Sequence, residues 1–318
     1  IYKAAKLGDA KGQYLTANAL KNAIGTEKDL TKSFEWFVLS ADQNLPEAKL
    51  ELGYAYREGL GVEKNATEAF KWFLASAENG DKTAQNEVGK SLRDGSGTLR
   101  DAKGAFKWFE KSANLGDPDA MTNLALAFLD GQGVIRDIEA AITWLEKGSL
   151  REEPRADYHL GKMYASGTHL EKNENEAFSL IRRAAQKGLM VAQRELGEFY
   201  KKGIGTDQNL IESFKWIKKA AKQRDRRAYY LLSQAYFKGE GTKKNNKLAL
   251  SNAKKALALG LEEASFLIDV LSSSTNTKTE IIAQSENGLN FGRYHALIIG
   301  NDDYQNVSKL NTGEIDAR

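Results

Sequence analysis

The sequence contains no cysteine and only three prolines among its 318 residues. Without cysteine, these residues cannot provide a disulfide framework, a cysteine zinc site, an iron–sulfur cluster or a thiol nucleophile. The sequence also lacks a run of about 18 apolar residues, so we expect no transmembrane helix and no membrane partner. These absences fit a cytoplasmic location, and no motif suggests a cofactor or a metal.

Proline is scarce, but glycine is abundant, with 28 residues. Hydrophobic residues make up 41% and aromatic residues 9% of the chain, which is enough to form a core and excludes a disordered or collagen-like protein. The ratio of glycine to proline predicts many helices, each ended by glycine.

The residues recur with a period of 36, which indicates a repeat protein. One series of tryptophans is Trp36, Trp72, Trp108, Trp144 and Trp216, with Leu180 in the missing place. One series of alanines is Ala48, Ala84, Ala120, Ala156, Ala192, Ala228 and Ala264. The register already fits at Ile1, so we expect the array to extend further toward the N-terminus.

The first half of each period has the pattern of a helix that ends at glycine. In residues 47–57, Ala48, Leu52 and Tyr56 lie four residues apart and form one apolar stripe. Gly59 and Gly61 follow and are expected to end the helix, because a chain leaving a helix through the left-handed region favours a residue without Cβ.

The second half of the period has the pattern of another helix. Asn65 precedes it, and its side-chain oxygen is expected to cap the first turn. Ala69, Trp72, Phe73 and Ala77 form its apolar stripe. We expect the tryptophans to be core residues, and the small alanines to let neighbouring helices approach. Such hairpins bury their apolar faces only by stacking into a solenoid.

The motif Leu52-Gly53-x-x-Tyr56-x-x-Gly59-x-Gly61-Val62, followed by Ala69-Phe70-x-Trp72-Phe73, resembles the Sel1-like repeat, a relative of the tetratricopeptide repeat. The similarity covers residues 1–272. Single repeats depart from it at Ala125, Ser233, His169 and Leu180. The resemblance implies an all-α superhelical solenoid that assembles protein complexes and has no chemistry of its own.

The basic residues are concentrated in one part of the chain. Residues 182–255 contain 19 basic and 6 acidic residues, whereas residues 1–181 contain 23 and 28, and residues 256–318 contain 4 and 9. The candidate partner-binding residues in this block are Lys215, Lys218, Lys219, Lys222, Arg224, Arg226, Arg227, Lys243, Lys244 and Lys247.

This basic block has two interpretations. It is either a set of solvated faces that keeps the array soluble, or a surface that attracts an acidic partner. The nearby aromatic residues Tyr229, Tyr230, Tyr236 and Phe237 mostly fall at core positions, which argues against base stacking. An acidic protein partner is therefore favoured over nucleic acid.

Residues 273–290 are expected to form a linker, and the segment after it has another character. Residues 295–300, His-Ala-Leu-Ile-Ile-Gly, form an apolar run typical of a buried parallel strand. Residues 291–304, together with Leu310-x-Thr312 and Asp316-Ala317, resemble the opening of a bacterial caspase-like (metacaspase or orthocaspase) peptidase domain. The resemblance implies a cysteine endopeptidase whose His–Cys dyad is not contained in this chain, so residues 291–318 are expected to be the first strand of a truncated α/β domain.

The same resemblance places Asp316 in an acidic pocket for a basic substrate residue. A helix-capping role for Asp316 is an equal alternative. Other constellations are weaker: His159 and His169 flank a helix end, but no third ligand completes a metal site.

We therefore expect a regulatory repeat module that docks a partner controlling a caspase-like endopeptidase. One alternative is a non-enzymatic scaffold, and a second is a nucleic-acid-binding subunit of a defence-type assembly that uses the basic block.

Overall fold

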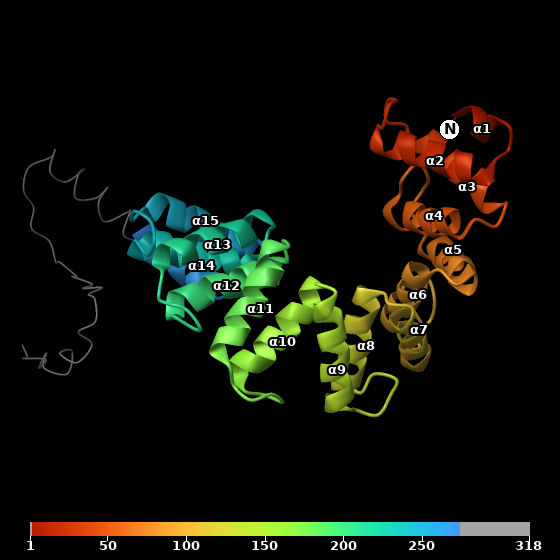
Figure 1. Ribbon diagram of the computed structural model, residues 1–318. Coiled ribbons are helices and arrows are strands. Elements are labelled where there is room, and N and C mark those ends of the chain that lie inside the picture. The colour runs from red at the N-terminus through yellow and green to blue at the C-terminus, as the bar shows by residue number, and fades with distance from the viewer. Residues whose placement is uncertain (1, 274–318) are drawn as a thin grey trace, which may run out of the picture. The chain divides into compact units, whose positions relative to one another are not determined.

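The computed structural model describes residues 2–273, and every regular element in this part of the chain is a helix (Figure 1). The predicted linker beyond residue 273, the predicted strand at 295–300 and Asp316 lie outside the described residues. The predictions for a caspase-like domain therefore stay predictions.

The helices follow the predicted period, and nearly all contain 13 residues. They are α1 (Tyr2–Lys6), α2 (Ala10–Asn22), α3 (Leu30–Ala41), α4 (Pro46–Glu58), α5 (Ala66–Glu78), α6 (Lys82–Asp94), α7 (Ala102–Asn114), α8 (Pro118–Asp130), α9 (Ile138–Leu150), α10 (Pro154–Ser166), α11 (Glu174–Gln186), α12 (Met190–Lys202), α13 (Leu210–Lys222), α14 (Arg226–Lys238) and α15 (Asn246–Ala258). Further helical turns occupy residues 264–273.

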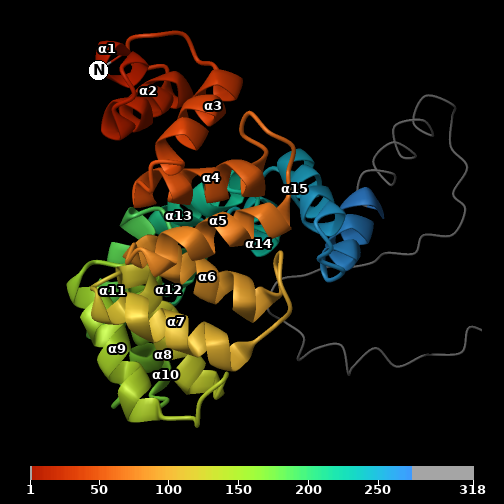
Figure 2. The same ribbon diagram turned by 90° about the vertical axis from the view of Figure 1, so that its right-hand side faces the viewer.

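Each helix packs mainly on the helix before it and the helix after it in the chain. Figure 2 shows this order, with α4 to α7 following one another. The closest packing is within the pairs α2–α3, α4–α5 and their equivalents, and each pair then packs on the next. This arrangement is the predicted all-helical solenoid of stacked hairpins.

Local side-chain chemistry sets the helix ends as predicted. The Asn65 side chain accepts a hydrogen bond from the backbone N–H of Glu68 at 3.1 Å, which caps α5. Gly59 and Gly61 both lie in the left-handed region, with φ of 76° and 77°. His169, which replaces the second glycine in one repeat, keeps that conformation with φ of 71°.

The small residues of the repeat are buried as predicted, but the tryptophans are not the centre of the core. All seven alanines of the Ala48 series have no exposed surface. Trp72 is only half-buried, whereas the next residue, Phe73, is fully buried between α4 and α5. Both residues belong to the predicted apolar stripe, and Phe73 is its fully buried member, while Trp72 contacts the core and stays partly exposed. Trp72 packs against a buried cluster that contains Phe37 of α3 with Ala48 and Leu52 of α4, so it lies at the contact between successive repeats.

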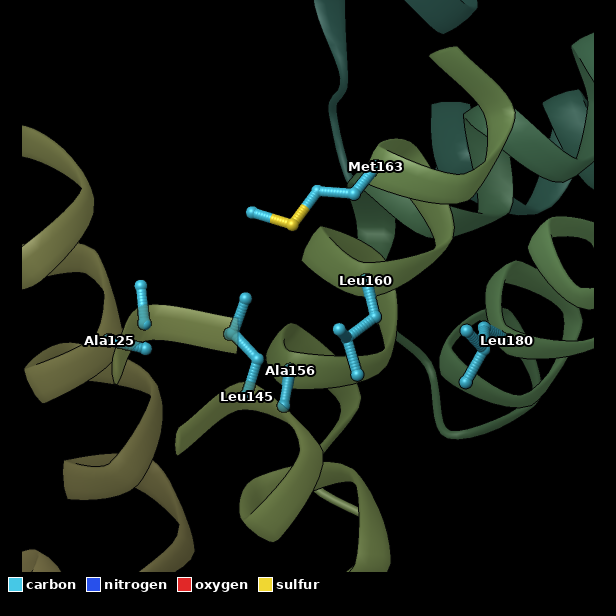
Figure 3. Close-up of a cluster of buried hydrophobic side chains, with 7 residues drawn as sticks. Ala125, Leu145, Ala156, Leu160, Met163 and Leu180 are labelled. Carbon is cyan, nitrogen blue, oxygen red and sulfur yellow. The ribbon is translucent and has the colours of Figure 1, made fainter. Parts of the chain in front are cut away.

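One buried cluster illustrates how the helices share a core (Figure 3). Ala125 comes from α8, Leu145 from α9, Leu160 and Met163 from α10, and Leu180 from α11. Leu180, which replaces tryptophan in this repeat, is almost fully buried. This cluster thus joins α8, α9, α10 and α11, which holds adjacent repeats together.

Candidate functional site

All ten candidate basic residues are exposed, on or between helices α13, α14 and α15. Lys215, Lys218, Lys219 and Lys222 lie on α13 at steps of three and four, so they share one face of that helix. Arg224 lies in the turn before α14 with a left-handed φ of 67°.

Lys215 lies near the middle of α13, and the structure divides the other nine residues into two groups. Lys218, Lys219, Lys222 and the three arginines lie around the junction of α13 with α14. Lys243, Lys244 and Lys247 lie around the loop from α14 to α15, at the other end of α14. A 13-residue helix separates its ends by about 20 Å. We name the first group, together with Lys254 and Lys255 near the end of α15, the basic junction.

Nine of the ten cations have no carboxylate partner among the described residues. The exception is Lys215, which pairs with Glu212 at 2.7 Å on the surface of α13. Asp225, the acidic residue inside the basic junction, is buried and already bound to Arg194 at 2.6 Å. The charge of the basic junction is therefore not neutralised within this part of the chain.

Some of these cations lie on aromatic rings instead. Lys219 lies 3.7 Å from the ring centroid of Trp216, and Lys255 lies 5.6 Å from that of Tyr229. Such contacts are cation–π interactions, worth about 0.5–1 kcal/mol at exposed sites. They place these lysines against one face of each ring.

The two histidines form no metal site. Among residues 2–273, no group of three or more His, Asp or Glu side chains is placed to hold a metal ion. Burial, with a smaller contribution from Arg155, lowers the pKa of His159 to about 4. His159 is therefore neutral at pH 7 and lies at ring-contact distance from Tyr158.

The structure also shows an ion pair between successive repeats that our sequence interpretation missed. Arg57 of α4 donates to Glu87 of α6 at 2.6 Å, and Glu87 is almost fully buried. The same guanidinium lies over the Tyr54 and Phe73 rings. The signal was present in the sequence as a basic residue at positions 21, 57, 93 and 201, all in one register of the 36-residue period.

A solenoid of stacked helical hairpins, as residues 2–273 form it, defines a helical repeat protein. The Sel1 repeat matches the sequence in seven segments, residues 10–45, 46–81, 82–117, 118–151, 154–189, 191–225 and 226–261. The chain therefore belongs to the Sel1 repeat family, whose members act as scaffolds for protein interactions.

Solved structures agree with this assignment. A protective antigen of uropathogenic Escherichia coli strains displaying an SLR fold is 28% identical with a TM-score of 0.66, over 85% of this chain and 58% of that one. This chain thus spans little more than half of that protein. A Sel1 repeat protein from Oxalobacter formigenes is 27% identical with a TM-score of 0.67, over 84% and 77% of the two chains.

More distant similarity extends to yeast Tom70, at 14% identity and a TM-score of 0.51, over 90% of this chain and 62% of that one. It concerns the fold alone. No curated protein matches the sequence. Among the described helices, none has the length and apolar character that crossing a bilayer requires.

Proposed function

We propose that this chain is a scaffold that binds an acidic protein surface through the basic junction of α13, α14 and α15. The observation that carries the proposal is that the cations of the basic junction lack a carboxylate partner in the described part of the chain, where the one acidic residue among them, Asp225, is bound to Arg194. Clustered, unneutralised charge attracts a partner of opposite sign and accelerates encounter. We place this interaction in the cytoplasm, since the chain contains no cysteine.

The test compares two double charge reversals in the same protein. Lys222→Glu with Arg227→Glu removes charge from the basic junction, whereas Lys103→Glu with Lys107→Glu removes two exposed, unpaired lysines of α7. Poly-L-glutamate is the acidic probe, titrated at two salt concentrations. We expect the first variant to weaken binding about tenfold and the second to weaken it little.

Equal binding by both variants would refute the basic junction as the site. An RNA arm, with poly(U) at matched charge, distinguishes the alternative partner. If poly(U) bound more tightly than poly-L-glutamate and lost more affinity in the Lys222→Glu and Arg227→Glu variant, the nucleic-acid-binding interpretation would replace the acidic protein partner.

We further propose that the repeats regulate a caspase-like cysteine endopeptidase. The support is the sequence of residues 291–318, including Asp316 as a candidate pocket residue for a basic substrate side chain. The test is cleavage of Arg-terminated and Asp-terminated reporter peptides by the full-length protein, with and without residues 1–272. Arg-specific cleavage that changes when the repeats are removed supports the proposal, and absence of cleavage leaves the scaffold function alone.

A further inference from the structure

Lys21, Arg57 and Lys201 occupy the same position of the 36-residue period, and each is bound by a carboxylate of the following repeat. The carboxylate comes from one of two positions, either the next first-half helix or the loop that follows it. The pairs are Lys21–Glu51 at 2.6 Å, Arg57–Glu87 at 2.6 Å and Lys201–Glu240 at 2.7 Å.

Arg93 is the exception at this register. The two positions that could supply its carboxylate hold the neutral amides Asn123 and Gln132. Arg93 makes only a long hydrogen bond of 3.4 Å to the side-chain oxygen of Asn123. Its other N–H groups turn back to Asp94, the adjacent residue in the chain, at 2.8 and 3.0 Å.

A cavity opens where the carboxylate is missing. The space beside Lys21 and Glu51, and the space beside Lys201 and Glu240, each hold about 10 Å³. The equivalent space beside Arg93, between α6, α7 and α8, holds about 210 Å³. Its apolar wall includes Phe106, Phe109 and Leu126, and its polar wall includes Arg93 and both amides.

A second guanidinium contacts the same amide. Arg155 of α10, which is also paired with Asp119 at 3.0 Å, donates to the side-chain oxygen of Asn123 at 3.1 Å, so two arginines converge on one neutral amide oxygen. The Asn123 amide nitrogen in turn donates to Asn86 at 2.8 Å. A carboxylate is a stronger acceptor than an amide for two guanidinium groups.

We propose that this cavity binds the side-chain carboxylate of an acidic residue from a partner protein. That carboxylate would occupy the position that Glu51 and Glu240 occupy in the repeats where the cation is paired within the chain. The apolar wall accepts the aliphatic part of the ligand, and Arg93 binds its carboxylate. The site lies on α6 to α8 and is separate from the basic junction on α13 to α15.

One wall of the cavity carries a negative charge that would repel a ligand carboxylate. Asp130 lines the same space, has no cationic partner among the described residues and accepts only a hydrogen bond of 3.4 Å from Gln132. We therefore place the ligand carboxylate on the Arg93 side of the cavity. Removing the charge with Asp130→Asn should strengthen binding about two- to threefold.

The experiment uses NMR titration of the whole chain with an acetylated and amidated hexapeptide that contains one Glu between two Leu residues. We expect shifts at amides of α7 and α8, and about tenfold weaker binding of the same peptide with Gln in place of Glu. A third peptide, with Gln and a free C-terminus, distinguishes a terminal carboxylate from a side-chain carboxylate.

Two variants of the protein test whether the missing carboxylate beside Arg93 creates the binding site. Asn123→Glu supplies the missing carboxylate in the chain itself, so it should abolish peptide binding and raise the melting temperature. Arg57→Gln changes the equivalent position of another repeat, where Glu87 already supplies the carboxylate, and should leave peptide binding unchanged. Equal shifts from the Glu and Gln peptides, or normal binding by Asn123→Glu, would overturn the proposal. Charge reversal at the basic junction should leave this binding intact, so either site can fail alone.

Discussion

Gly61 combines a conformational need with a steric one. Its φ of 77° is left-handed, and a Cβ at this position would lie 2.0 Å from the carbonyl oxygen of Leu30 in the preceding repeat. Gly80 has a similar φ of 88° but open space around it. We therefore predict that Gly61→Ala lowers the free energy of unfolding by about 3 kcal/mol, and Gly80→Ala by only about 1 kcal/mol. Urea denaturation of both variants measures the difference, and equal losses would show that contact with Leu30 is unimportant.

His159 should make the stability of the fold depend on pH. Its pKa is about 4 in the folded protein, below the ordinary value of 6.5. As the pH falls, His159 is therefore protonated in the unfolded chain before it is protonated in the folded protein. The stabilisation from neutral His159 is complete above pH 6.5 and is lost as the pH falls toward 4. At pH 5 we predict a loss of about 2 kcal/mol relative to pH 7. His159→Gln should remove this part of the pH dependence in urea unfolding, while an unchanged slope would contradict it.

At the scale of elements, the buried ion pair joins the first-half helices of successive repeats. Glu87 on α6 accepts from Arg57 at 2.6 Å and from Lys90 at 2.5 Å, and it is almost fully buried. Glu58 contacts the same Arg57 at 2.9 Å but is exposed. Glu87→Gln should cost about 1–3 kcal/mol, because it leaves Arg57 without its buried partner. Glu58→Gln should cost less than about 0.5 kcal/mol. Thermal unfolding of the two variants tests this, and similar melting temperatures would contradict a coupling of α4 to α6.

At the scale of the whole molecule, the sequence predicts those features that depend on residues close together in the chain. Caps such as Asn65 and helix ends such as Gly59 depend on neighbouring residues, and the 36-residue period repeats them seven times. The identity of the core residue was harder to predict, because Trp72 and Phe73 are adjacent and the rotation of α5 decides which one is buried. The cavity at Arg93 depends on residues 30 and 39 positions away, so it could be found only after the helices were placed side by side.

Because each helix packs mainly on its neighbours in the chain, unfolding need not involve all repeats at once. Phe73 on α5 and Phe199 on α12 are both fully buried aromatic residues in distant repeats. Truncation of either to alanine should cost about 3–5 kcal/mol. For Phe73→Ala, we predict faster hydrogen exchange in α4 to α6 with little change in α12 to α14, and for Phe199→Ala the reverse pattern. Hydrogen-exchange mass spectrometry of the two variants reads both regions in one experiment. Uniform loss of protection in either variant would mean that the solenoid unfolds as a single cooperative unit. The two sites proposed above would then unfold together, with the same free energy of unfolding.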